Sequence, residues 1–206
     1  MNDTPTAPLK SSNNKYLQWW PMLIAPAALI TLISIAGQFG KLTMKSFAEP
    51  ISPPILALAT VIFALTAWRR RNPLCWVLTG LAFSFTCREI HFYGTHKGIT
   101  VALAVLAVWT ILWRERLLAA ARNISHSRWV AASAFTYVLS KLVEKRVFRA
   151  ERLPLIPNED AIHITLEEGM ELVAHLLLLL SAVMGAWIAS KAPGNPAEAS
   201  RPTESD

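Results

Sequence analysis

Residues 163–189 read HITLEEGMELVAHLLLLLSAVMGAWIA, and this stretch decides the expected fold. From Leu176 onward the stretch is apolar around the whole circumference of a helix, apart from small residues. Its length matches the roughly 20 residues that a helix, rising about 1.5 Å per residue, needs to cross the hydrocarbon core of a membrane. Its first half carries acids and histidines instead. The stretch therefore predicts a transmembrane helix that is polar on one side over half of its length.

The rest of the chain repeats this apolar character in blocks. Of its 206 residues, 53% are hydrophobic and 17% are charged, whereas a soluble domain carries roughly a quarter charged residues. The fold class we expect is all-α: a polytopic transmembrane helix bundle of about six spans that forms one domain over residues 17–189. The expected spans are 17–37, 51–68, 73–92, 98–118, 129–143 and 164–189.

Two of these segments have alternative interpretations. The fifth, 129–143, is short and interrupted by polar residues, which favours a buried or strongly tilted helix. The first follows Lys10 and Lys15 and ends near small residues, as a secretory signal peptide does, but its apolar run is longer than a typical signal sequence. We expect this segment to be retained as a span, with cleavage as the alternative.

The charges and the tryptophans predict the topology. Both ends, 1–16 and 190–206, are polar and rich in small residues, which predicts disordered tails. Short loops rich in lysine and arginine favour the cytoplasm, and a cytoplasmic amino terminus gives that side the larger share of the basic residues. All eight tryptophans then fall at one membrane interface, where indole rings are favoured. We expect an inner-membrane protein with both tails cytoplasmic.

Other features exclude several classes of function. The net charge of +6 is dispersed over loops, which indicates membrane lipids as partners and no nucleic acid. Cys75 and Cys87 are twelve residues apart on one expected helix, too far for a disulfide, and they have no zinc-finger spacing. The sequence has no Gly-rich phosphate loop, no GxSxG and no HExxH.

Ionisable residues gather in two places on the expected outer side. The segment CREIHFYGTHKG (87–98) ends the third span and supplies Arg88, Glu89, His91 and His96. His96 lies in a glycine-containing turn, where exposure is the ordinary expectation.

The last span supplies the second group of ionisable residues. His163, Glu167, Glu171 and His175 recur at four-residue steps and occupy a band roughly 120° wide on a helix, with Glu168 just beyond its edge. His163 also fits a solvated helix start, and Glu168 fits a first-turn acid that complements the helix dipole. An unpaired charged side chain inside a membrane costs about 3 kcal/mol or more of free energy. These side chains must therefore face each other or water.

Two interpretations of the cluster stay open. The structural one is an interhelical ion-pair network, in which Arg88 pairs with Glu167 or Glu171 and Lys141 pairs with Glu144 or Glu168.

The functional interpretation is a binding site. Its ligands for zinc or another divalent metal would be His91, Glu167, Glu171 and His175, with Arg88 orienting a carboxylate or binding an anionic headgroup. A proton relay or a cation site uses the same residue types.

The segment CREIHFYGTHKGIT resembles one found in small, uncharacterised bacterial multi-pass inner-membrane proteins, where Arg-Glu at a helix end is followed by Asp or His and then by His-Lys. Those proteins are similar also in a Glu-Glu pair that opens the last span, matched here by LEEGMEL. The positions that carry the resemblance are Arg88, Glu89, His91, His96, Lys97, Glu167, Glu168 and Glu171. That family implies membrane location and no particular activity.

A fainter resemblance is to the membrane metallohydrolases that include the alkaline ceramidases. Those proteins use three histidines, an aspartate and a serine in a seven-helix core, two of the histidines forming an HxxxH pair. This chain has no HxxxH pair and one expected span fewer. We expect a membrane protein that uses the cluster to bind a metal, a cation or a lipid headgroup. A metal-dependent hydrolase and a non-enzymatic scaffold are the alternatives.

Overall fold

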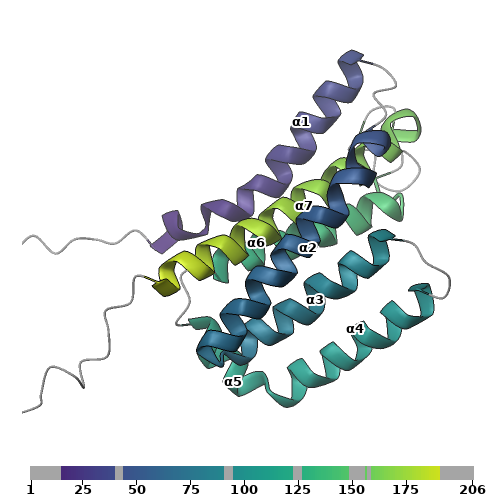
Figure 1. Cartoon of the computed structure of the whole chain (residues 1–206). Helices are drawn as coiled ribbons and strands as arrows, with labels where there is room; N and C mark the ends of the chain where they lie inside the picture. Colours follow the sequence, from purple (N-terminus) through teal and green to yellow (C-terminus); the bar gives the residue numbers. More distant parts are fainter. Residues whose placement is uncertain are drawn as a thin grey trace, which may run out of the picture.

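The structure, a computed structural model, describes residues 15–39, 44–90, 95–122, 127–148, 156 and 159–190. Over these ranges the chain is helical and contains no strand (Figure 1), which confirms the all-α fold class. Its elements are η1 (Lys15–Leu23), α1 (Ile24–Phe39), α2 (Met44–Arg70), α3 (Pro73–Ile90), α4 (Thr95–Leu112), α5 (Arg114–Arg122), α6 (Ser127–Glu144) and α7 (Glu159–Ser190). The tails predicted to be disordered, 1–16 and 190–206, lie almost wholly outside the described residues.

Three helical segments in the described part of the chain are long and apolar enough to cross a membrane. They are Trp19–Ala36, Ser46–Arg70 and Asp160–Ala186. In α4 the described apolar stretch, Val101–Leu112, is shorter. The six longer helices overlap the six expected segments, so a membrane-spanning helical protein is supported and the count of six spans stays a prediction.

Helix boundaries differ from the expected ones at three places. α2 begins at Met44, seven residues before the expected start at residue 51, and runs through Pro50, Pro53 and Pro54. The expected segment 98–118 is divided by a turn at Trp113, after which α5 carries mostly basic and small residues. α7 begins five residues before the expected start at residue 164 and is 32 residues long.

α7 is the central helix of the bundle. It packs against α1, α2 and α6, while α3 packs on α2, and α4 lies at the edge against α3 (Figure 1). Leu166, Met170, Ala174 and Leu178 on α7 are at most 1% exposed. Because lipid tails are as apolar as leucine, close packing of these side chains against α1, α2 and α6 is what holds a central membrane helix in place.

Two apolar clusters lie at different depths along α7. The first joins α1, α6 and the first half of α7 through residues that include Leu32, Val143, Leu166 and Met170. The second joins α2, α3 and the second half of α7 through residues that include Leu56, Phe63, Leu78, Leu178 and Ala182. Residues 171–175 of α7, with Glu171 and His175, lie between the two clusters. The apolar packing therefore fixes the depth of the polar residues.

The outward faces of the helices are apolar as well. On α4, Val101, Val105, Val108 and Leu112 recur at helical spacing and are 56–74% exposed. On α2, Leu58, Val61, Leu65 and Trp68 are more than half exposed. Large contiguous apolar surfaces are rare on soluble monomers, and lipid tails are the solvent that suits them.

Hydroxyl groups inside the helices are satisfied locally. Nine serine and threonine hydroxyls in the described residues donate to the carbonyl four residues earlier; they are those of Thr31, Ser34, Thr60, Thr66, Thr79, Ser84, Thr86, Thr110 and Thr136. In hydrocarbon no water is present to satisfy such a group, so this pattern suits helices within a membrane.

A tight connection orients α3 against α2. Arg71 adopts a left-handed φ of 50° directly after α2. Asn72 then caps α3, because its side-chain Oδ1 accepts a hydrogen bond from the Leu74 amide at 2.9 Å. Pro73 occupies the first helical position, where its missing N–H costs nothing. The hairpin brings the amino end of α3 beside the carboxyl end of α2.

We expect the change Asn72→Ala to lower the free energy of unfolding by about 1 kcal/mol, because the first turn of α3 loses its cap. Arg71→Gly is expected to act in the opposite direction, raising it by roughly 0.5–1 kcal/mol, because glycine adopts a positive φ without a Cβ clash. Thermal unfolding of both variants in detergent measures the two signs, and shifts of the same sign would contradict this account of the turn.

Candidate functional site: a buried glutamate shared by three helices

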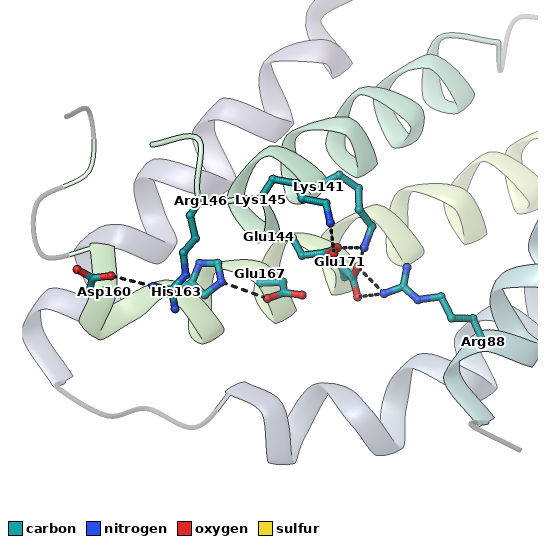
Figure 2. A network of polar contacts seen from close by, with 9 residues as sticks. All are labelled: Arg88, Lys141, Glu144, Lys145, Arg146, Asp160, His163, Glu167 and Glu171. Carbon is teal, nitrogen blue, oxygen red and sulfur yellow. Dashed lines mark hydrogen bonds and ion pairs between the residues drawn. The ribbon is translucent and has the colours of Figure 1, made fainter. Parts of the chain in front are cut away.

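Glu171 on α7 is the centre of the charged cluster, and it is only 6% exposed. The Arg88 Nη2 on α3 donates to both of its carboxylate oxygens, at 2.7 Å to Oε1 and 2.9 Å to Oε2 (Figure 2). The Lys141 Nζ on α6 donates to Oε1 at 3.0 Å. Three helices therefore converge on one carboxylate, and we call Arg88, Lys141 and Glu171 the hub.

Lys141 has a second acidic partner on its own helix. Its Nζ also donates to the carboxylate of Glu144, three residues later, and the Lys145 Nζ lies 3.7 Å from the other oxygen of Glu144. Glu144 ends α6, just beyond the expected span. Lys141 thus bridges the carboxylates of Glu144 and Glu171.

Glu167 extends the hub by one turn of α7 toward the helix start. The His163 Nε2 lies 3.6 Å from its carboxylate (Figure 2). One carboxylate oxygen from each of Glu144, Glu167 and Glu171 can be chosen so that all three lie within 4.8 Å of one another. This separation is short enough for three oxygen atoms to share one cation, since Ca²⁺–oxygen distances are about 2.3–2.6 Å.

Among the side chains that the structure describes around the hub, carboxylates outnumber basic groups. Glu89 lies beside Arg88 at 3.8 Å, and Glu168 lies within electrostatic reach of Glu167 and Glu171. With Glu144, five carboxylates thus face three basic side chains, those of Arg88, Lys141 and Lys145. The surplus negative charge favours uptake of a cation.

A separate ion pair closes the end of the bundle. The hydrogen bonds from the Arg146 amide to the Val143 carbonyl and from the Val147 amide to the Leu142 carbonyl end α6 in a Schellman motif, with Arg146 at a φ of 53°. The Arg146 side chain donates to Asp160 at the start of α7 at 3.0 Å. Both side chains are largely exposed, so this pair contributes little to stability.

The structure gathers some of the predicted site residues. Arg88, Glu89, Glu167 and Glu171 come together, and of the alternatives left open by the sequence Arg88 pairs with Glu171 and Lys141 pairs with Glu144. Glu168 is half-buried beside them.

The histidines of the predicted site are not among the residues that the described part of the structure brings together. His91 lies outside the described residues, and His96 is described only as part of the α4 backbone. His175 is 2% exposed one turn beyond Glu171 and does not belong to the converging ligand atoms found among the described residues. The zinc site of His91, Glu167, Glu171 and His175 therefore stays a prediction.

The sequence reading missed two residues as members of the site. Lys141 and Glu144 were expected only as a possible ion pair, but Lys141 joins the carboxylates of α6 and α7. Their signal in the sequence was the lysine that ends the polar series Ser133, Thr136 and Ser140, all at most 1% exposed in the structure. This series shows that the polar side of α6 faces the interior.

No protein-family model matches the chain, and neither the curated proteins nor the solved structures contain a significant match. The resemblance of CREIHFYGTHKGIT to small bacterial inner-membrane proteins thus stays an expectation. The geometry of the hub carries the functional conclusion.

Proposed function

We propose that the protein is an integral inner-membrane protein of six spans, with both tails cytoplasmic, whose hub region binds a cation in the outer half of the bundle. Three helical segments are long and apolar enough to span. α3, α4 and α6 have 18 residues each, about 27 Å of helix, close to the roughly 30 Å hydrocarbon thickness. Their apolar outward faces support the same assignment.

The tryptophans and arginines support the orientation. Trp20 of η1 and Trp129 of α6 meet edge to face at 5.2 Å, although they are far apart in the sequence. Arg69 and Arg70 end α2 and Arg114 begins α5, and these helix ends lie together at the end of the bundle opposite the hub (Figure 1). Basic residues favour the cytoplasmic side, so the hub faces outward. Anionic lipid headgroups are the partners that suit the basic end.

The observation that carries cation binding is the approach of Glu144, Glu167 and Glu171, with the Lys141 ammonium between two of them. The ammonium neutralises part of the charge in the resting protein. A cation that enters displaces the ammonium and takes carboxylate oxygens as ligands. Because the converging atoms are all oxygens, the site favours hard cations such as Ca²⁺, Mg²⁺ or Mn²⁺; zinc would need the histidines as well.

The test is a titration of purified, detergent-solubilised protein with each divalent cation, followed by thermal unfolding and by elemental analysis after desalting. We expect one hard cation to raise the Tm, since a ligand at 100 times its Kd stabilises the folded state by about 2.7 kcal/mol. Glu167→Gln is expected to abolish the shift and still fold, because Glu167 is not bonded to Arg88 or Lys141. Asp160→Asn, outside the converging oxygens, serves as the matched control. A Tm that no cation changes would overturn the proposal.

A second candidate is a purely structural role for the hub. The specific observation in its favour is that both oxygens of Glu171 already accept hydrogen bonds from Arg88. In that case the protein is a membrane scaffold in which the hub sets the positions of α3, α6 and α7. The titration separates the two functions, because the scaffold predicts the same Tm with and without divalent cations.

A further inference from the structure

Three buried polar atoms next to the hub have no hydrogen-bond partner among the described residues. They are the Tyr137 Oη and the Ser140 Oγ on α6 and the His175 Nδ1 on α7. Ser140 is 0% exposed and His175 is 2% exposed. Buried polar atoms without a partner are rare in folded proteins and cost free energy, so three of them at one interface require a common explanation.

The three side chains lie along the interface between α6 and α7. The rings of Tyr137 and His175 face each other with centroids 5.5 Å apart. Tyr137 is one turn from Lys141 on α6, and His175 is one turn, about 6 Å, from Glu171 on α7. The Tyr137 ring also lies within electrostatic reach of Glu171. The unpaired atoms are therefore neighbours of the hub on its inward side.

Other contacts surround these three side chains on their inner side and beside the Tyr137 ring. One turn deeper, the Ser133 hydroxyl donates to the Ala174 carbonyl at 2.9 Å and joins α6 directly to α7. Phe85 on α3 covers the Tyr137 ring at a centroid distance of 4.6 Å. The hub is the polar group next to these three atoms on the remaining side.

We propose that Tyr137, Ser140 and His175 line a buried site for a small hydrogen-bonding guest of the size of water, continuous with the hub. Hydroxyl groups donate and accept, and a neutral imidazole nitrogen does one or the other, so one or two water molecules satisfy all three. A buried water typically makes two to four such bonds. The site goes beyond the cation site, and neither depends on the other.

The depth of this site gives it a consequence. The span-length window Asp160–Ala186 has its midpoint at Val173, two residues from His175. Water at His175 therefore reaches the middle of the membrane-spanning part of α7. Hydrogen-bonded water next to a histidine, a tyrosine and a glutamate is a path along which protons move, and ionisable residues at this depth commonly serve such relays.

Hydroxyl-radical footprinting of the wild-type protein tests whether water is present. Radicals formed from internal water modify a neighbouring aromatic ring in addition to the radicals that arrive from bulk solvent, so the comparison needs a ring of similar burial. We expect Tyr137 to be modified at least tenfold faster than Phe85, which is half-buried as well and packs on the Tyr137 ring. The reaction is run with a chelator, so that it is independent of divalent cations. A Tyr137 no more reactive than Phe85 would overturn the proposal, whatever the variants do.

The sign of a stability change tests whether the hydroxyl holds the guest. If Tyr137 Oη were dry and unpaired, Tyr137→Phe would leave the Tm unchanged or raise it, because an unsatisfied buried group is removed. If the hydroxyl binds water, the same change lowers the Tm by roughly 2–4 °C, the shift expected for one lost hydrogen bond in a chain of this size. Ser181→Ala is the control, since that buried hydroxyl bonds within its own helix. If radicals modify the Tyr137 ring but Tyr137→Phe leaves the Tm unchanged, the Tyr137 hydroxyl does not bind the guest. The assignment of three hydrogen-bond partners to the guest would then be overturned.

Discussion

Glu171→Ala is expected to lower the free energy of unfolding by about 2–4 kcal/mol and the Tm by roughly 10 °C. The change leaves the Arg88 guanidinium and the Lys141 ammonium without the carboxylate that they share. Breaking a buried ion pair costs about 3–5 kcal/mol when the remaining charge is fully buried. Here the side chains of Arg88 and Lys141 are 33% and 42% exposed, which reduces the cost.

The matched control and the rescue make this prediction specific. Glu168→Gln, on the same turn of α7 but without a basic partner in the described part of the chain, is expected to change the Tm by less than a third as much. Replacing the whole hub, as Arg88→Met, Lys141→Met and Glu171→Leu together, is expected to recover most of the loss, because an apolar set of similar volume often replaces buried charges without cost. Thermal unfolding in one detergent compares the three variants. A triple variant as unstable as Glu171→Ala would contradict the role of the ion pairs.

Gly169→Leu is expected to separate α1 from α7 and to lower the free energy of unfolding by about 2–3 kcal/mol. A Cβ at Gly169 would lie 2.8 Å from Leu32 Cδ1 and 2.9 Å from Cδ2, so the Leu32 side chain must shift, and a whole leucine at position 169 would displace it from the apolar cluster in which it is packed. Close approach at a small residue is a common way for membrane helices to pack. The smaller change Gly169→Ala should cost less, because alanine favours a helix over glycine by about 1 kcal/mol and offsets part of the clash.

Gly98 on α4 provides the control for Gly169. A Cβ there would meet nothing within 4 Å, so Gly98→Leu is expected to be neutral or stabilising by about 0.5–1 kcal/mol through helix propensity. The exchange Leu32→Ala with Gly169→Leu should restore part of the stability, because it moves the bulk from α1 to α7. If Gly98→Leu and Gly169→Leu lower the free energy of unfolding equally, a leucine destabilises either helix. The explanation by close packing of α1 on α7 at Gly169 would then be contradicted.

Much of the fold could be predicted from apolar blocks alone. The start of α2 could not, because the apolar block begins at residue 51, whereas the helix begins at Met44 and continues through Pro50, a residue without an amide donor. Neighbouring helices often support proline inside membrane helices, and sequence propensity does not contain that support. The turn at Trp113, where α4 gives way to α5, does have a signal in the sequence, because the charged residues 114–116 follow it directly, yet the expected span ran on to residue 118.

The sequence predicted a buried cluster of charged residues, but it did not determine which of them pair with each other. Arg88 was expected to pair with Glu167 or Glu171, which lie on one face of α7 one turn apart. The choice between them depends on the depth of α3 relative to α7, and α3 is held in place by its packing on α2. Likewise, the sequence placed Lys141 beside Glu144 but not beside Glu171, because the contact between α6 and α7 joins residues thirty positions apart.

The central position of α7 also bears on how the protein is made. Helices emerge from the ribosome in chain order, at about 5–20 residues per second, so α1 to α6 are synthesised before the helix on which α1, α2 and α6 pack. During that interval Arg88 and Lys141 are already in place and their shared carboxylate is not yet synthesised. A chain that stops before α7 therefore lacks both the helix on which α1, α2 and α6 pack and the carboxylate that Arg88 and Lys141 share.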